Sequence, residues 1–299
     1  MHQIYIFNRE TKQTEKEKSC GEKLLCYLYD KKNFFARIVL FFIARISMFS
    51  HLYGLWQKRT ASKEKIAPFV KDFFIDSSEF EKPLSEFISF NDFFIRKLKK
   101  TVRPVDQDPS VCVMPADGRC LVIENIDLSD GFYVKGEKFT LSSFIKNKTL
   151  IEKFSGGSLA IIRLAPVDYH RFHFPFDCFA HTPALINGPL FSVNPIALKN
   201  NISILSKNKR MITELDSEIF GRVLYVEIGA TNVGSIHQTF EIGIYKKGEE
   251  KGYFSFGGSS IVLLFEKEKI RFDQDLIDAS NKKMETKVKE GTSLGKSLS

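Results

Sequence analysis

Short apolar and alternating runs follow one another along the chain from about residue 111 onward. The clearest are CLVIENI at 120–126, SLAIIRL at 158–164, RVLYVEI at 222–228, FEIGIY at 240–245 and SSIVLLFE at 259–266. Clusters of Gly, Asn, Asp and Lys separate them, and such short runs between turn residues are typical of β-strands. The pattern predicts a mostly antiparallel β domain within an α+β protein.

A helical pattern precedes these strands at residues 84–100, LSEFISFNDFFIRKLKK. Its apolar positions recur at helical spacing: Phe87, Phe90, Phe94 and Leu98. Ser89 and Asp92 stand in the positions of a capping box, and basic residues lie at the end of the segment. The segment therefore predicts one helix that ends before Pro104.

Residues 33–56, NFFARIVLFFIARISMFSHLYGLW, are apolar enough to raise the question of a membrane helix. Arg37 and Arg45 interrupt the run, which leaves no clean stretch of the about 20 apolar residues that spanning needs. On a helix these two arginines lie about 80° apart, so a wide apolar surface remains beside them. We expect an amphipathic helix that lies in the lipid headgroup layer; a core helix of a larger domain is the alternative.

The positive charge of the chain is concentrated in the same region. Residues 31–65 carry eight Lys and Arg against Glu64 alone, which supplies +7 of the formal net charge of +8. A surplus confined to one short segment does not resemble a nucleic-acid-binding face, which needs a broad basic stripe or a recognition motif. The distribution instead favours an anionic membrane surface as partner.

Composition agrees with a folded, enzyme-sized protein of 299 residues with 43% hydrophobic content. The five cysteines are scattered without a Cys-x-x-Cys pair or a histidine at ligand spacing, so we expect no metal site and a reducing compartment. The N-terminus lacks the basic start and apolar core of a secretory signal. These features predict a cytoplasmic location for the folded part.

Three segments carry candidate chemistry. His170 and His173 lie in LAPVDYHRFHFP, Asp117 lies in VMPADGRC, and Ser259 follows Gly257 and Gly258 in FSFGGSSIVLLF. Together an aspartate, a histidine and Ser259 provide the parts of a relay that activates a hydroxyl. Each has an ordinary alternative: two polar histidines, a Pro-x-Asp-Gly turn, and a hairpin turn at the glycines.

Seven motifs in order give the chain a family resemblance: FNDFFIRKLK with RPV, PADG, FYVKGEKFTL, LAPVDYHRFHFP, FSVNP, VEIGATNVGSI and KGEEKGYFSFGGSS. Over about residues 68–266 the chain resembles the phosphatidylserine decarboxylases, which are self-processing pyruvoyl enzymes. The family's usual processing site is Leu-Gly-Ser-Thr. Here Gly257 and Ser260 stand in the Leu and Thr places, and the Gly258–Ser259 bond is the one to be cut.

The resemblance implies that Ser259 attacks the carbonyl of Gly258, and that the resulting ester eliminates to leave a pyruvoyl group in place of the serine. It implies that Asp117 and His173 activate Ser259 for the cut and that His170 handles a proton in turnover, although the two histidines could exchange roles. The covalent pyruvoyl cofactor would form a Schiff base with phosphatidylserine, accept electrons as CO₂ leaves and release phosphatidylethanolamine.

These expectations divide the chain into a basic, amphipathic, helical membrane-associating region, 1–67, and a β-rich catalytic domain, 68–299. Cleavage would give a large chain, 1–258, and a small chain, 259–299, held as a heterodimer, with a higher homo-oligomer left open. We expect a peripheral enzyme on the cytoplasmic side of the cell membrane. The rival interpretations are an uncleaved Ser-His-Asp lipid hydrolase and a non-enzymatic membrane-surface β module.

Overall fold

The computed structural model describes residues 4–18, 26–29, 54–126, 132–134, 137–139, 144–145, 148–200, 204–230, 236–257 and 259–298. Most of the predicted helix at 33–56 lies outside the described residues, and so does Gly258. Residues 54–58, which overlap the end of the predicted helix, are helical. No helix in the described part of the chain is long and apolar enough to cross a membrane.

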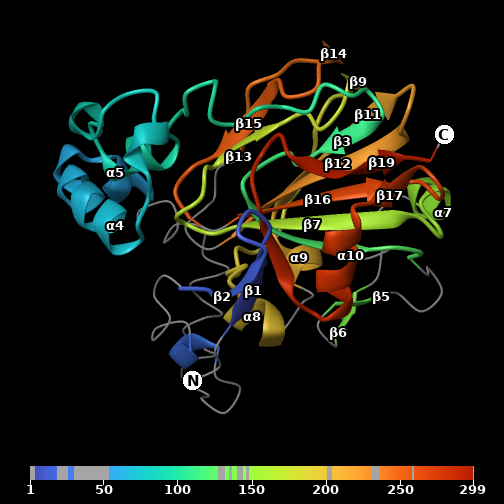
Figure 1. Cartoon of the computed structure of the whole chain (residues 1–299), viewed down its shortest axis with the longest axis horizontal. Helices are drawn as coiled ribbons and strands as arrows, with labels where there is room; N and C mark the ends of the chain where they lie inside the picture. The colour runs from blue at the N-terminus through green and yellow to red at the C-terminus, as the bar shows by residue number, and fades with distance from the viewer. Residues whose placement is uncertain are drawn as a thin grey trace.

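One large sheet organises the molecule (Figure 1). Its strands among the described residues are β1 (Tyr5–Asn8), β2 (Gln13–Lys16), β4 (Gly118–Ile123), β7 (Ser158–Leu164), β9 (Cys178–Ala180), β10 (Ala184–Ile186), β11 (Arg210–Ser217), β12 (Gly221–Gly229), β14 (Gly243–Tyr245), β16 (Ser259–Phe265) and β18 (Glu285–Val288). Their order is β14-β9-β11-β12-β16-β7-β4-β18-β1-β2, with β10 also paired to β11. Only β1 and β18 pair in parallel among these described strands, so the predicted, mostly antiparallel β domain is confirmed.

Three smaller sheets accompany it. They are β13 (Ile236–Gln238), β15 (Glu250–Phe254) and β8 (Arg171–His173); β17 (Ile270–Phe272), β19 (Ser293–Ser297) and β3 (Val111–Val113); and the pair β5 (Phe132–Val134) and β6 (Glu137–Phe139). The β13-β15-β8 sheet packs on one face of the large sheet. Phe172 of β8 contacts Phe254 of β15 and Tyr225 of β12, with ring centroids 4.8 and 6.1 Å apart.

Helices cover the opposite face of the large sheet. They are α7 (Lys148–Lys153), α8 (Pro195–Asn200) and α9 (Ile204–Lys207), while α10 (Gln274–Asn281) packs near β4 and β18. Ala197 of α8 and Leu205 of α9 join Val226 and Leu264 of the sheet in a second apolar core. Alternate residues of β12 and β16 thus enter different cores, as the period of two in a strand requires.

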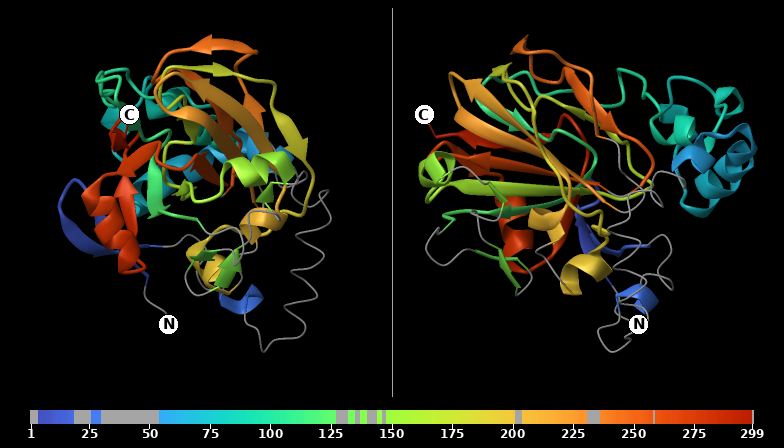
Figure 2. Two further views of the ribbon diagram at one scale, coloured as in Figure 1. Left: turned by 90° about the vertical axis from the view of Figure 1, so that its right-hand side faces the viewer. Right: turned by 180° about the vertical axis from the view of Figure 1, so that it is seen from behind.

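A helical lobe stands to one side of the sheets in Figures 1 and 2. It contains η1 (Thr60–Lys65), α4 (Ile66–Asp72), η2 (Ser77–Glu79), η3 (Leu84–Glu86) and α5 (Phe90–Phe94). Its centre is a cluster of aromatic rings that includes Phe80, Phe87, Phe90 and Phe93. This burial accounts for part of the high Phe content of the chain.

The predicted helix over 84–100 is wrong in length, because α5 spans only Phe90–Phe94. Its start is as expected: the Ser89 hydroxyl accepts the backbone N–H of Asp92 at 3.2 Å. After Ile95 the chain becomes extended, and Leu98 forms a β-bridge with Phe80. Tertiary pairing of Leu98 replaced the helical turns that its spacing favoured.

Two further expectations are corrected near the chain's N-terminus and at the glycine pair. Residues 4–17, assigned by sequence to a helical region over 1–67, form the β1–β2 hairpin at one edge of the large sheet. The hairpin alternative for Gly257 and Gly258 is also wrong, because β15 and β16 belong to different sheets. SLAIIRL, by contrast, coincides with β7, and SSIVLLFE contains β16.

Candidate active site

Ser259 is the first residue of β16, in the middle of the large sheet. It lies opposite Gly229 of β12 and Leu164 of β7, and it is fully buried. Its Oγ has no hydrogen-bond partner among the described residues. Buried hydroxyls in folded proteins are nearly always paired, so this one calls for a functional explanation.

The chain reaches Ser259 by crossing from the small sheet to the large one. Gly257, on this crossing, has φ +140°, a backbone angle that glycine adopts far more readily than other residues. The preceding Phe256 is held by the helical lobe: its N–H donates to the Asn91 side chain at 3.2 Å, and its ring packs on Phe94. The lobe thus fixes the approach to Ser259.

His170 lies beside this crossing, just before β8. Its Nδ1 is 2.9 Å from the Asp168 carbonyl, which can only accept, so Nδ1 carries the proton and Nε2 is left as a base. Burial lowers the pKa of His170 to about 3, although the nearby Asp168 and the backbone of Gly257 act in the opposite direction. Nε2 has no hydrogen-bond partner of normal geometry in the described part of the chain.

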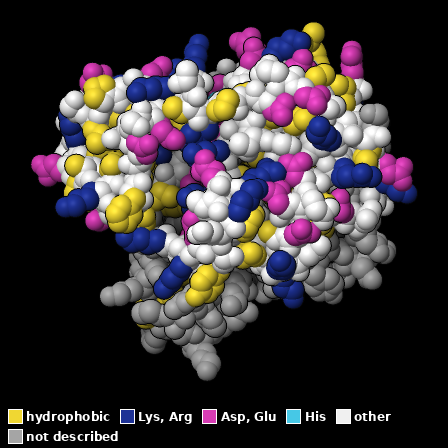
Figure 3. Space-filling model, in the orientation of Figure 1, with side chains coloured by type: hydrophobic (Ala, Val, Ile, Leu, Met, Phe, Trp, Pro, Cys, Tyr) yellow, Lys and Arg dark blue, Asp and Glu magenta, His cyan; other side chains and the backbone are white. Residues whose placement is uncertain are grey.

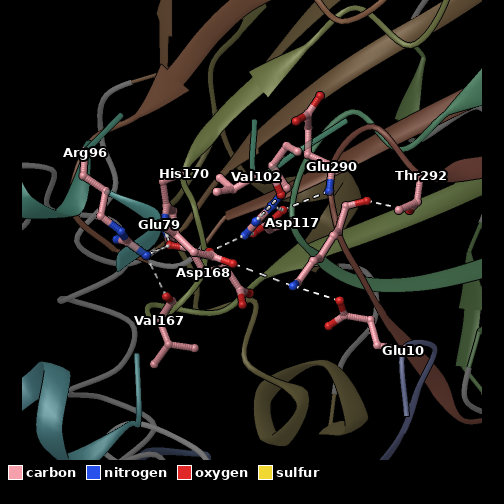
Figure 4. Close-up of polar contacts among 12 residues, drawn as sticks. Glu10, Glu79, Arg96, Val102, Asp117, Val167, Asp168, His170, Glu290 and Thr292 are labelled. Atoms are coloured by element: carbon pink, nitrogen blue, oxygen red, sulfur yellow. Dashed lines mark hydrogen bonds and ion pairs between the residues drawn. The ribbon is translucent and has the colours of Figure 1, made fainter. Parts of the chain in front are cut away.

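The loop that holds His170 is itself anchored by charge. The Arg119 guanidinium binds the Asp168 carboxylate, and the Ala165 N–H donates to the same carboxylate at 2.6 Å. Arg96 donates to the carbonyls of Val167 and Asp168 at 3.0 and 3.1 Å (Figure 4). His170 therefore sits on a loop with little freedom to move.

His173 ends β8 and is buried beside the Tyr169 ring, 5.8 Å away between centroids. Burial lowers the pKa of His173 to about 4, so the ring is neutral at physiological pH. Its Nδ1 lies 3.9 Å from a carboxyl oxygen of Glu290. That carboxyl is buried next to Asp117, and both effects raise the pKa of Glu290 to about 8.

Asp117 is held by Arg103, which lies in the RPV motif but had no predicted role. Arg103 donates to both carboxylate oxygens of Asp117, at 2.9 and 2.6 Å, and also to Glu79 at 3.0 Å. The Glu290 backbone N–H donates to Asp117 at 2.8 Å, and Figure 4 shows the two residues side by side. Glu290 therefore lies between Asp117 and His173, and no direct hydrogen bond joins Asp117 to His173 among the described residues.

The four predicted residues are thus all buried, but they are not joined as one hydrogen-bonded relay. Three of them, His170, His173 and Ser259, keep a buried polar atom without a hydrogen-bond partner in the described part of the chain. No role was predicted for Arg103, although its RPV motif is part of the family resemblance, or for Glu290, because a Glu in a C-terminal turn carries no local signal of function. Among the described residues, no group of three His, Cys, Asp or Glu could hold a metal ion.

Comparison with known proteins gives consistent matches. A family model described as phosphatidylserine decarboxylase matches residues 90–296. The phosphatidylserine decarboxylase proenzyme of Chlamydia muridarum is 47% identical over 297 residues, which cover 99% of this chain and 98% of that protein. The proenzyme of Chlamydia caviae is 45% identical, with 100% and 99% covered, and that of Chlamydia pneumoniae is 43% identical, with 99% and 98% covered.

Proposed function

Because the chain belongs to the phosphatidylserine decarboxylase family, we propose that it converts phosphatidylserine to phosphatidylethanolamine and CO₂ after cutting its own backbone between Gly258 and Ser259. One observation carries the cut: a fully buried serine hydroxyl, without a hydrogen-bond partner in the part of the chain that is described, directly follows a glycine-rich crossing between two sheets. The relatives, moreover, bear the name proenzyme.

The proposed cut uses only groups of the chain and water. Ser259 Oγ attacks the Gly258 carbonyl, its proton passes to a neutral imidazole, and the peptide C–N bond gives way to an ester. Loss of the Ser259 Cα proton then breaks the Cβ–O bond, which frees a carboxylate at Gly258 and leaves dehydroalanine. Water finally replaces the nitrogen of that residue, which departs as ammonia, and a pyruvoyl group remains.

The histidines have distinct proposed roles. His173, with Asp117, takes the Ser259 proton during cleavage, and His170 handles a proton during turnover. Both rings are neutral at pH 7, so each can accept a proton. The place of His170 beside Gly257 also suits it to the first role, and the comparison of His170→Ala with His173→Ala in rates of cleavage and of CO₂ release separates the assignments.

The surroundings of Ser259 fit a pyruvoyl group. Ser259 is fully buried at the start of a central strand, and its hydroxyl has no hydrogen-bond partner among the described residues. When present, the pyruvoyl ketone supplies an electrophilic carbonyl that accepts the electrons released as CO₂ leaves. The chain's own part is to exclude water and to hold His170 with its free Nε2 beside that position.

We propose that the two cleavage products stay together. Within the small chain, 259–299, β16 lies between β12 and β7, β18 lies between β4 and β1, and β19 pairs with β3. These partner strands all belong to the large chain. Separation would expose a central strand of the sheet, so we expect a stable heterodimer.

The helical lobe is the proposed membrane-facing part, on the cytoplasmic side of the cell membrane. Phe74 and Ile88 of the lobe expose 90 and 68% of their surface, and Leu55 and Trp56, just before the lobe in the chain, expose 44 and 48%. Figure 3 shows hydrophobic side chains on the lobe among basic and acidic ones. A surface of this kind suits shallow contact with anionic lipid, and the lobe also holds the crossing before Ser259.

Intact-mass analysis of the purified chain tests the proposal. We expect fragments 1–258 and 259–299, the second lighter by one ammonia than a hydrolysis product and reactive toward hydrazides. Ser259→Ala should stay whole and release no CO₂ from phosphatidylserine vesicles. Ser260→Ala, which removes a neighbouring buried hydroxyl on the other face of β16, is the matched control and should still be cut.

A wild-type chain that remains whole would refute the proposal. Labelling of that whole chain at Ser259 by a fluorophosphonate would then favour a lipid hydrolase, and absence of labelling would favour a non-enzymatic module.

A further inference from the structure

Five buried charged side chains form a cluster that the proposed chemistry does not use. They are Glu17, Arg119, Arg163, Asp168 and Glu285. None of the five side chains exposes more than 9% of its surface. Buried charges are costly unless they are paired, so a cluster of this size is a specific requirement of the fold or of the function.

Glu17 is the centre of the cluster. One of its carboxylate oxygens forms an ion pair with Arg119 Nε at 2.6 Å, without the geometry of a hydrogen bond, and the other accepts from Arg163 Nη2 at 2.7 Å. Arg163 also binds Glu285 at 2.8 Å, and Arg119 binds Asp168. Each arginine is therefore shared between two carboxylates, and Glu17 contacts both arginines.

Arg119 and Asp168 favour each other's charged form within this cluster. Burial alone would lower the pKa of Arg119, but the carboxylates of Asp168 and Glu17 outweigh it and raise that pKa. Burial alone would raise the pKa of Asp168, but Arg119 outweighs it and lowers that pKa. Removal of the Glu17 charge would take one of these carboxylates away from the buried Arg119 and leave it drawn toward Asp168, so the guanidinium would have to shift.

That shift would reach His170 through one residue. The Asp168 carboxylate is bound by Arg119, while the backbone carbonyl of the same residue accepts the His170 Nδ1–H at 2.9 Å. A displaced Asp168 would release or turn the imidazole, whose Nε2 faces the crossing before Ser259. Misplacement of a reacting group by about 1 Å can cost about a hundredfold in rate.

Glu17 comes from the N-terminal hairpin, far from His170 in sequence. It follows β2, and its N–H donates to the Ile4 carbonyl at 2.9 Å, which closes the hairpin. The chain then continues toward residues 31–65, the basic stretch predicted to meet the membrane. The hairpin is thus continuous with the predicted membrane-associating region and in contact with the cluster behind His170.

We propose that Glu17 and Arg119 are positioning residues for His170, so that the N-terminal hairpin completes the scaffold of the active site. The proposal rests on the proposed decarboxylation, in which His170 handles a proton. It also means that truncation of residues 1–65 would remove a part of the catalytic domain, so that membrane binding is better tested by point substitution.

The test is Glu17→Gln, which keeps the shape of the side chain and removes its charge. Turnover is measured on phosphatidylserine vesicles and divided by the number of pyruvoyl groups, counted with a hydrazide, so that unfolded or uncut chains do not contribute. We expect kcat per pyruvoyl group to fall by about tenfold to a hundredfold, with KM within about twofold of wild type. Arg119→Lys keeps the positive charge but replaces the branched guanidinium by one ammonium group, and its kcat per pyruvoyl group should fall by a smaller factor.

Glu10→Gln is the matched control, because Glu10 lies on the same hairpin with its side chain 58% exposed. It should leave kcat unchanged. An unchanged kcat per pyruvoyl group in both Glu17→Gln and Arg119→Lys would overturn the inference, and so would an equal loss in Glu10→Gln. A wild-type chain without pyruvoyl or CO₂ release would instead refute the proposed function, so the two failures are distinct.

Discussion

Lys251 of β15 and Glu227 of β12 form an ion pair that is fully buried between the small and the large sheet. Their Nζ and Oε1 atoms are 2.5 Å apart, and neither side chain is exposed. Lys251 also donates to Thr213 at 2.9 Å and to Gln238 at 3.0 Å, so its three donors are all used. We predict that Lys251→Met strongly destabilises the chain, because it leaves the Glu227 carboxylate buried without a counter-ion.

The magnitude follows from the burial. Loss of one partner of a buried pair costs about 3–5 kcal/mol, which for a protein of this size is a fall in Tm of about 10 °C. The double substitution Lys251→Met with Glu227→Leu removes both charges and should recover most of that loss. Lys246→Met is the control, since Lys246 is 71% exposed and pairs with Asp177 at the surface, where an ion pair is worth at most about 1 kcal/mol.

Thermal unfolding in the Ser259→Ala background, where the chain stays whole, measures these changes. Burial already raises the pKa of Glu227, against the effects of Lys251 and Gln238, and Lys251→Met removes the larger of these two opposing effects. A carboxyl whose pKa is higher in the folded than in the unfolded protein stabilises the fold at low pH, and this contribution is lost as the pH rises through the folded pKa. The deficit of Lys251→Met should therefore shrink as the pH is lowered from 8 to 5. A deficit below about 1 kcal/mol at pH 8, or a double variant no better than the single one, would refute this reasoning.

Three further predictions concern titration and membrane contact. The folded pKa values of His170 and His173 are about 3 and 4, against 6.5 for a free histidine. The free energy of unfolding should therefore fall as the pH drops below 6.5, by up to about 1.4 kcal/mol per pH unit for each ring. In urea unfolding, His170→Phe should show a weaker dependence of this free energy on pH. The folded pKa of Glu290 is about 8, against 4.5 for a free glutamate, so its contribution to the stability of the protein should be lost between pH 4.5 and 8. Glu290→Gln should abolish that loss, and a variant with the same dependence of stability on pH as the wild type would contradict the assignment. Phe74→Ser should reduce flotation with anionic liposomes several-fold, whereas Ile244→Ser, 78% exposed on β14, should not; equal flotation of both variants would exclude the lobe as the contact surface.

Local sequence was a good guide wherever short-range physics decides the structure. The runs that became β7, β12 and β16 are apolar between turn residues, and burial on both faces of a central strand selects such runs. The Ser89 cap was also visible, since an N-cap contact involves residues only three apart. The same local reasoning failed for residues 84–100, where pairing of Leu98 with Phe80 ended the helix early.

The candidate site shows the same division. The order of the motifs pointed to Asp117, His170, His173 and Ser259, and the structure places all four in the interior. The motifs did not show that Arg103 holds Asp117 or that Glu290 lies beside His173.

By itself, then, the sequence determined the central strands of the large sheet, the family and the residues that bear the chemistry. Only the tertiary structure decided which charges meet: Glu17 and Arg163 are 146 positions apart, and Arg163 and Glu285 are 122 apart. Such pairs leave no periodic trace, because one charged residue in a strand looks like any other until the sheet register brings its partner to it. The register depends on the whole set of strands packing at once, and for that reason the scaffold behind His170 appears only in the folded molecule.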